Sequence, residues 1–386
     1  MIRSLLLLFA LLMAVVPATA WAQGADDIWQ RYDGAADGFT NVYTQSQSMD
    51  PRTTQGNRVY RQAISQGQRL VEVLEERTFP VAELHLLGDS EDVGHTVPFK
   101  GRNLRVGEAD RFDFSRTQLV FLVGASALLS ECRVKALAAG CRVVDLSASI
   151  PVEQQLCVVP EVNGGLLDSL PDQRAIASPL PEAVALAIAL KPIQQQLDLH
   201  RVTVTACLPV SSRGAAGVKE LARQTSELLN ARPLEPRIFG RQMAFNMLAQ
   251  AEAVDAQGYG AQERRLVEEL RQLLDMPELA VSVTFVQAPV FFGESLIVSL
   301  QGGVEADMPA LSAALDAAPG VELVESDDYP TAVGDAVGQE AIYVGRLRRG
   351  ICDPREVNLW IVSDNVRKGA ALNAVQSGEL LIKDYL

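Results

Sequence analysis

The sequence has few residues suited to metal or disulfide chemistry. Its 386 residues include three histidines, and its five cysteines are odd in number and scattered, with no Cys-x-x-Cys pair. Such spacing excludes a disulfide framework and is typical of a chain folded in a reducing compartment. We therefore expect no metal site. The residues are His85, His95 and His200, and Cys132, Cys141, Cys157, Cys207 and Cys352.

Basic charge is also scarce. The formal net charge is −14, with 34 Lys and Arg against 48 Asp and Glu. Nucleic-acid binding needs a basic face to meet the phosphates, so we expect no nucleic-acid partner. With 48% apolar residues and only 6% aromatic ones, the composition is that of an α/β protein. The length suffices for two domains, each with its own core.

Long apolar runs are missing except at the start. Arg3 precedes an apolar run from Leu5 to Val16, and Ala20-Trp21-Ala22 follows. This pattern predicts a signal peptide over 1–22, cleaved after Ala22, with no further membrane association. The protein would then be periplasmic or secreted, or cytoplasmic if the N-terminus is a fusion or start-site artefact. Residues 23–58 are polar and aperiodic, and we interpret them as a linker.

Two different patterns of apolar residues follow the linker. Short apolar runs at 81–87, 117–124 and 141–147 alternate with helical patterns at 68–77 and 127–140, which predicts a doubly wound parallel sheet. Beyond residue 198 the predicted strands lengthen and indicate an antiparallel or mixed sheet in an α+β domain. Its strands are expected at 199–210, 279–290 and 295–302, its covering helices at 217–230 and 261–274, and a final helix at 366–385.

The stretch "IASPLPEAVALAIAL" (176–190) lies where the two patterns meet. It reads as a strand end, a Pro-stiffened turn and an apolar helix, with Pro181 and Glu182 suited to the first helical turn. Ligands usually bind at this carboxyl edge of a parallel sheet. A catalytic chain would be expected to place a Cys or Ser at the head of the helix, and this one has a proline.

Five motifs, in order along the chain, resemble the aspartate-semialdehyde dehydrogenase family. They are "VVPEVN" (158–163), "AFN" (244–246), "PVFFGES" (289–295), "VGRLRRG" (344–350) and "SDNVRKGAALNAVQ" (363–376). The resemblance covers about residues 68–386 and is strongest to the catalytically degenerate Usg-type paralogues. It implies a Rossmann-like dinucleotide-binding domain over 59–178, an α+β dimerisation domain over 179–350, and a C-terminal segment, 351–386, that packs back on the first domain.

The resemblance also implies a chemistry that this chain has lost. Family members attack the substrate acyl carbon with a Cys thiolate and use a His base, NADPH and phosphate. The nucleophile position falls at Pro181, the base position at Glu294, and the position of an orienting Gln at Leu208. Without a thiol no covalent intermediate can form. We therefore name no catalytic residue.

The ligand-binding positions are kept only in part. Of the three glycines in the family's cofactor loop only Gly67 remains, because Arg61 and Ile64 occupy the other two positions. We expect no cofactor, or NADP if the family function is retained. Arg346 matches a substrate-carboxylate arginine. Glu263 and Arg265 match residues near the substrate, or they form a solvated helix face. Arg367 and Lys368 either face the site or cap a turn.

Three hypotheses follow. The first is a catalytically silent paralogue that binds a ligand or dimerises, as a homodimer or as a heterodimer with an active paralogue. The second is an active oxidoreductase of altered chemistry that uses Cys207 or Cys157 as a relocated thiol. The third is an exported binding protein.

The family resemblance fails upstream of about residue 66. The family's central first strand is replaced by "NRVYR", which is too short and too charged for a slot buried on both faces. A fusion of two reading frames explains this break, and we expect residues 57–62 to be poorly ordered.

Overall fold

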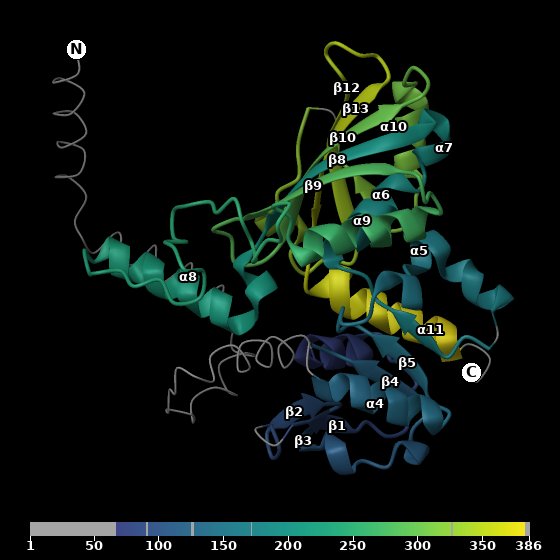
Figure 1. The fold of residues 1–386 in the computed structure, drawn as a ribbon, viewed down its shortest axis with the longest axis vertical. Coiled ribbons are helices and arrows are strands. Elements are labelled where there is room, and N and C mark those ends of the chain that lie inside the picture. Colours follow the sequence, from purple (N-terminus) through teal and green to yellow (C-terminus); the bar gives the residue numbers. More distant parts are fainter. Residues whose placement is uncertain (1–66, 90–91, 125–126, 171, 326, 383–386) are drawn as a thin grey trace. The chain divides into compact units, whose positions relative to one another are not determined.

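The computed structural model describes residues 67–89, 92–124, 127–170, 172–325 and 327–382 (Figure 1). All of them belong to the compact unit Pro51–Leu386. The predicted signal peptide, the linker and the segment 57–62 lie outside the described residues. So do Arg61 and Ile64 of the cofactor loop.

The first described element is a helix over residues 67–76, and a small sheet follows it. In this sheet β1 (Leu86–Gly88) pairs in parallel with β3 (Arg102–Glu108), and β3 pairs antiparallel with β2 (Thr96–Phe99). The strand predicted over 81–87 is therefore mostly wrong. The chain still turns there, because the Val81 N–H donates to the Phe79 carbonyl at 2.7 Å.

A second sheet confirms the predicted parallel arrangement. Its strands are parallel in the order β4-β5-β7-β6, with bounds Leu119–Leu122 (β4), Arg142–Asp145 (β5), Leu156–Cys157 (β6) and Ala175–Ala177 (β7). Helix α4 (Ala127–Ala138) connects β4 to β5 and ends two residues earlier than predicted. Gly140 then takes a φ of +87°, the left-handed conformation that ends helices.

The larger domain is built on a six-stranded sheet in the order β11-β12-β13-β10-β8-β9. The bounds are Leu199–Leu208 (β8), Ala280–Gln287 (β9), Glu294–Gly302 (β10), Val321–Leu323 (β11), Ile342–Arg349 (β12) and Glu356–Ser363 (β13). Strands β8, β10, β13 and β12 are successively antiparallel, whereas β8–β9 and β11–β12 are parallel. The sheet is therefore mixed.

Helices cover one face of this sheet and form the main core with it (Figure 1). They are α6 (Pro181–Leu190), α9 (Ala261–Leu274) and α10 (Met308–Asp316), with the one-turn helices α5 (Pro160–Asn163) and α7 (Gln194–Leu197) beside them. Helix α6 is apolar all round and buried almost throughout, as expected for a helix enclosed on every side. Helix α8 (Gly214–Leu229) begins three residues earlier than predicted and packs in a separate apolar cluster with Met243 and Leu248.

The C-terminal segment returns to the first domain, as predicted. A π-helical turn (Arg367–Leu372) leads into α11 (Asn373–Ile382), which packs in one core with the helix 67–76 and lies beside β5 (Figure 1). The Arg77 guanidinium binds both carboxylate oxygens of Glu379, at 2.9 and 2.8 Å. Across the described part of the chain, no helix is both long and apolar enough to span a membrane.

Candidate functional site

The turn from β7 into α6 places a proline ring where the family resemblance puts the nucleophile. Pro181 is the first residue of α6, after an extended Leu180. The ring lies against Gly369 of the π-helical turn so closely that a Cβ on Gly369 would stand 2.5 Å from the Pro181 Cβ. The position therefore serves packing between α6 and the C-terminal segment.

Glu294, at the base position, is the first residue of β10 and has no exposed surface. Its Oε1 accepts a 2.5 Å hydrogen bond from the Ser363 hydroxyl, directly across the β10–β13 ladder. Glu182, the second residue of α6, is also buried. Burial and the neighbouring Glu182 charge raise the pKa of Glu294 well above its ordinary value, and burial raises the pKa of Glu182 to about 7.

Leu208 completes this group, because it ends β8 next to Cys207, which pairs with Ser295 on β10. The Leu208 side chain is buried, and its carbonyl accepts the Gln287 amide at 2.8 Å. The fold thus brings Pro181, Glu294 and Leu208 to one end of the sheet.

Two amides at this end of the sheet were not predicted as site residues. Asn365 Oδ1 accepts the Gly293 N–H at 3.2 Å, and its amide group contacts Ser211. Gln287, which is completely buried, donates to the carbonyls of Leu208 and Pro209. Asn365 lies in the quoted motif "SDN", which is the signal that could have identified it. The sequence gives no such signal for Gln287.

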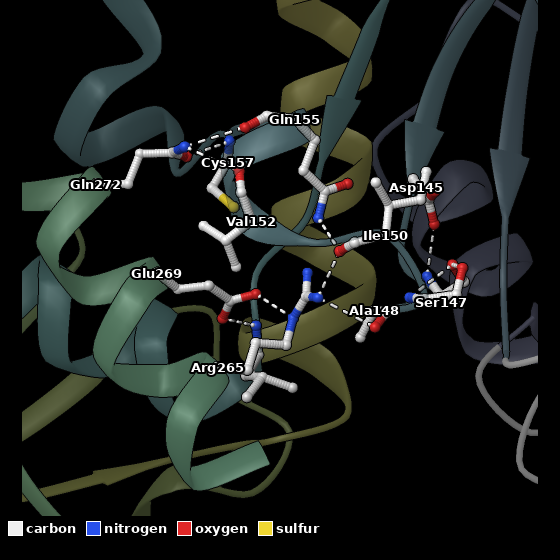
Figure 2. Close-up of polar contacts among 12 residues, drawn as sticks. Asp145, Ser147, Ala148, Ile150, Val152, Gln155, Cys157, Arg265, Glu269 and Gln272 are labelled. Carbon is white, nitrogen blue, oxygen red and sulfur yellow. Dashed lines mark hydrogen bonds and ion pairs between the residues drawn. The ribbon is translucent and has the colours of Figure 1, made fainter. Parts of the chain in front are cut away.

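Arg265 connects the two domains instead of lying on a solvated face. Its Nη1 donates to the carbonyls of Ala148 and Ile150 in the loop after β5, at 3.1 and 2.7 Å (Figure 2). Its Nε donates to Glu269 at 2.6 Å, and the other Glu269 oxygen accepts the Leu180 N–H at 2.8 Å. One arginine–glutamate pair therefore holds both the loop and the turn that starts α6.

The electrostatics of that pair are set by its burial. Glu269 is completely buried, and desolvation raises its pKa to about 7 although the Arg265 charge opposes the shift. Gln272, one turn later on α9, accepts the Cys157 N–H at 2.7 Å and donates to the Gln155 carbonyl at 3.0 Å (Figure 2).

Glu263 and Arg346 lie apart from this network. The Glu263 carboxylate accepts the Gly260 N–H at 2.8 Å and the Phe285 N–H at 2.7 Å, so it caps α9 and ties it to β9. Arg346 is exposed, with a φ of +51°, at a register shift between β12 and β13.

Arg367 and Lys368 are both engaged with carboxylates. Arg367 donates to Glu76 and Glu340 at 2.6 Å each. Lys368 is almost fully buried, and its Nζ pairs with Glu161 of α5. These contacts join the C-terminal segment to the first domain's helix and to α5.

The two cysteines proposed as relocated nucleophiles are poorly placed for that role. Cys157 has no exposed surface, and burial together with the nearby Glu269 raises the pKa of its thiol. Burial also raises the pKa of Cys207, which lies within β8. A reactive thiol needs the opposite shift, toward a thiolate at neutral pH.

The residues present fit a phosphorylated dinucleotide poorly. No described atom lies within 4 Å of the place where a Cβ on Gly67 would stand, so no close approach among the described residues requires a glycine there. At the carboxyl end of β1, the Asp92 side chain is nine-tenths buried against Gly88. Burial raises the pKa of Asp92 to about 6, which leaves it mainly ionised at neutral pH. An acidic group at this strand end suits a free ribose hydroxyl and disfavours the 2′-phosphate of NADP.

Among the described residues, no group of three or more His, Cys, Asp or Glu side chains is placed to hold a metal ion. The three histidines lie away from the α6 turn. His85 and His95 pair with Glu83 and Asp92 of the first domain, and His200 lies exposed at the start of β8.

Comparison with known proteins agrees with this architecture. Residues 65–169 match the semialdehyde dehydrogenase NAD binding domain, and residues 190–368 match the semialdehyde dehydrogenase dimerisation domain. The fold is thus that of a two-domain oxidoreductase. The chain is 53% identical to a USG-1 protein homolog of Azotobacter vinelandii over 82% of this chain and 94% of that protein. It is 37% identical to an aspartate-semialdehyde dehydrogenase of Shewanella violacea over 83% and 95%.

Solved structures give the same result. Aspartate semialdehyde dehydrogenase II from Vibrio cholerae superposes with a TM-score of 0.80 at 36% identity, covering 83% of this chain and 96% of that one. A Pseudomonas aeruginosa protein solved as a probable aspartate-semialdehyde dehydrogenase reaches the same TM-score at 51% identity, over 83% and 96%. The chain belongs to the aspartate-semialdehyde dehydrogenase family, among its Usg-type members.

Proposed function

We propose that this chain is a catalytically silent paralogue that keeps the dehydrogenase fold and acts by dimerising or by binding a ligand. The observation that carries the proposal is the packing of the Pro181 ring against Gly369. A proline has no nucleophilic side chain, so no covalent intermediate can form at residue 181.

The base position supports the same proposal. Glu294 is fully buried and accepts a hydrogen bond from the Ser363 hydroxyl. A general base must reach the proton that it abstracts, and this carboxyl is enclosed by protein. Cys157 and Cys207 offer no replacement, since burial raises the pKa of both thiols.

The direct test is phosphate-dependent oxidation of aspartate semialdehyde by the purified protein, followed as reduction of NADP or NAD. We expect turnover no faster than in a control without enzyme, because removing the nucleophile deletes the covalent step. The Vibrio cholerae enzyme named above serves as the positive control. Turnover clearly above background, lost on substitution of Cys207 or Cys157 by Ser, would establish the relocated-thiol hypothesis instead.

For the cofactor we propose weak or absent NADP binding. The support is the acidic Asp92 at the carboxyl end of β1 and the replacement of two loop glycines by Arg61 and Ile64. Titration of the protein with NADPH, followed by cofactor fluorescence, is expected to show no saturation at micromolar concentrations. A low-micromolar dissociation constant would contradict the proposal. Asp92→Ser is the informative variant, since relief of charge repulsion should strengthen binding of NADPH more than of NADH.

For the partner we propose a homodimer formed through the dimerisation domain, with a heterodimer with an active paralogue as the further possibility. Co-expression of this chain with a differently tagged aspartate-semialdehyde dehydrogenase from the same cell separates the two. Recovery of mixed dimers after two successive affinity steps supports the heterodimer, and recovery of like pairs alone excludes it.

We further propose that residues 1–22 direct export and are removed after Ala22. The basic start, the apolar run and the Ala-Trp-Ala site support this. The intact mass of the protein isolated from cells tests cleavage, and fractionation tests the compartment. An uncleaved or shorter cytoplasmic product would favour the fusion or start-site explanation.

A further inference from the structure

Helix α8 and the chain that follows it form an arm, residues 214–247, which stands out to one side of the six-stranded sheet (Figure 1). Among the described helices and strands, α8 contacts extensively only the 3₁₀ turn Val210–Arg213 that leads into it. The apolar side of α8 is covered by the returning chain, because Leu221 packs with Met243 and Leu248. The arm is therefore supported mainly at its base.

The outer turn of the arm is held by hydrogen bonds while its apolar side chains face solvent. The side-chain oxygen of Gln224, which is fully buried on α8, accepts the N–H groups of Met243 and Ala244 at 2.6 and 3.1 Å. Phe245 then takes a φ of +59°, a left-handed conformation that is rare for a bulky residue and that recurs at functional sites. Phe245 is 67% exposed and Met247 is 55% exposed.

The arm also carries basic charge on an acidic chain. Its segment 231–246 includes three arginines and one acidic residue, Glu235, whereas the whole chain has a formal net charge of −14. The three arginines, Arg232, Arg237 and Arg241, are all exposed. Aromatic residues, methionine and arginine are the types enriched in protein interfaces, and the arm presents all three.

A second feature, the strap formed by residues 327–340, crosses the open face of the six-stranded sheet. Ala332 of the strap packs with Val362 of β13. Trp360, on the same face of β13, donates its Nε1 hydrogen to the Pro330 carbonyl at 2.8 Å. The strap therefore lies on the face that α6, α9 and α10 leave uncovered.

The outer side of the strap is acidic and apolar. No Lys or Arg occurs between residues 321 and 345. Tyr329 is 61% exposed and Val333 is 46% exposed. Three aspartates of the strap are also exposed: Asp327, Asp328 and Asp335. The strap thus resembles the arm in its exposed apolar side chains and opposes it in charge.

We propose that the arm of one copy of this chain docks on the strap of a second copy. In this contact Phe245 and Met247 pack on Tyr329 and Val333, and the arginines of the arm face the aspartates of the strap. The inference rests on the homodimer proposed above and names surfaces that hold it together.

The observations select a second copy as the occupant. Both surfaces are exposed within one chain, and the apolar clusters of the arm and the strap share no residue. Both lie within residues 190–368, which match the dimerisation domain. Their opposite charges suit each other. Around a two-fold axis each copy gives one arm and receives the other, so the contact forms twice.

Charge reversal tests the contact. Arg237→Asp with Arg241→Asp makes the arm acidic, and Asp327→Arg with Asp328→Arg makes the strap basic. Each double variant by itself brings like charges together at both contacts of the dimer, which is unfavourable. We expect its dissociation constant, measured by sedimentation equilibrium, to rise at least about tenfold over that of wild type.

Mixing the two double variants excludes misfolding as the explanation. A dimer of one arm variant with one strap variant has opposite charges at both contacts, so it should form at least about tenfold more tightly than either variant pairs with itself. Phe245→Asp, which removes the apolar anchor, should weaken the wild-type dimer by at least about tenfold as well. Arg102→Asp with Lys135→Asp, a matched reversal at exposed positions of the first domain, should leave the wild-type value unchanged.

The outcomes separate this contact from the homodimer itself. A dimeric wild type whose variants show no gain on mixing would overturn the contact between arm and strap and leave the homodimer in place. A monomeric wild type at tens of micromolar would remove the homodimer and the contact with it. Unchanged homodimers, together with lost recovery of mixed dimers with an active dehydrogenase, would assign the arm to that partner and overturn the proposal.

Discussion

The residue that lies where the family resemblance puts the nucleophile is a packing residue. Pro181 is the first residue of α6 and has no backbone N–H. Its missing N–H costs the helix no hydrogen bond, because the first N–H groups of a helix have no partner within the helix. Its ring fits against Gly369. The proline ring at residue 181 therefore requires a residue without a side chain at position 369.

Gly369→Ala should therefore destabilise the fold. The new Cβ would stand 2.5 Å from the Pro181 Cβ and 2.9 Å from its Cα, so either α6 or the π-helical turn must move. We expect a loss of about 1–3 kcal/mol in the free energy of unfolding, measured by urea titration. Gly67→Ala is the control, because its Cβ has open space. It should be neutral or raise stability by up to about 1 kcal/mol. Similar effects for both changes would contradict this contact.

At the scale of elements, α9 is the part that joins the two domains. One of its faces packs into the core of the six-stranded sheet, and its polar residues reach across to the first domain. Arg265 holds the carbonyls of Ala148 and Ile150, and Gln272 holds the backbone of Cys157 and Gln155 (Figure 2). These bonds satisfy backbone groups that strand pairing leaves free, so α9 supports the loops at the carboxyl edge of the parallel sheet.

Arg265→Ala should destabilise the protein, and more at alkaline than at acid pH. Without the guanidinium, the buried Glu269 must remain protonated or carry an unpaired charge, and its pKa is already raised to about 7. The loss should be small at about pH 6, where Glu269 is protonated, and reach about 3 kcal/mol or more at about pH 9.

Two variants check this interpretation by urea unfolding at both pH values. Arg265→Ala combined with Glu269→Gln should remove the extra loss at alkaline pH, because no buried charge remains. Arg264→Ala, which breaks a surface pair with Asp255, should cost less than about 1 kcal/mol at either pH. A loss for R265A that does not change with pH would mean that Glu269 is not the reason for it.

The parallel strands of the first domain differ in burial. Strand β5 is buried at three of its four residues, whereas β4 is buried only at Leu122 and β1 at none. Within the described residues, β4 pairs only with β5 and β1 only with β3. Strand β5 pairs with both β4 and β7, so its buried residues lie inside the described parallel sheet.

At the scale of the whole molecule, the open face of the six-stranded sheet is the surface through which we expect two chains to associate. Helices α6, α9 and α10 cover the opposite face. On the open face Ile297 of β10 is half-exposed, with Thr205 and Trp360 as its neighbours across the ladders. Apolar and hydroxyl side chains at the centre of a sheet suit a self-complementary interface.

Ile297→Asp should weaken the dimer by at least about tenfold in dissociation constant, because it buries a charge at the interface. Light scattering and sedimentation at tens of micromolar should show wild type as a dimer and the variant shifted toward monomer. Val134→Asp, at a still more exposed apolar position on α4, should leave the dimer intact. A monomeric wild type, or equal effects of both changes, would exclude this face as the interface.

Local sequence signals were enough to predict the bounds of the helices and strands that have strong hydrophobic periodicity. The predicted bounds of α9 are those observed, β8 and β10 agree within two residues, and β9 agrees within three. The β2–β3 hairpin was missed because its turn uses Lys100 with a φ of +47° before Gly101, and a lysine gives little turn signal. The short strands β6 and β11 were missed because two or three residues carry no period.

What the sequence by itself determined was the family, the two-domain order and the presence of a proline where the family resemblance puts the nucleophile, because side-chain identity and periodicity are local properties. Tertiary structure alone decided what the remaining residues do. Glu263 and Arg265 are neighbours on one helix, yet Glu263 caps α9 while Arg265 bridges to Ala148, more than 100 residues away. Burial and partners set the charge and the role of such groups, and both arise from contacts between segments far apart in the chain.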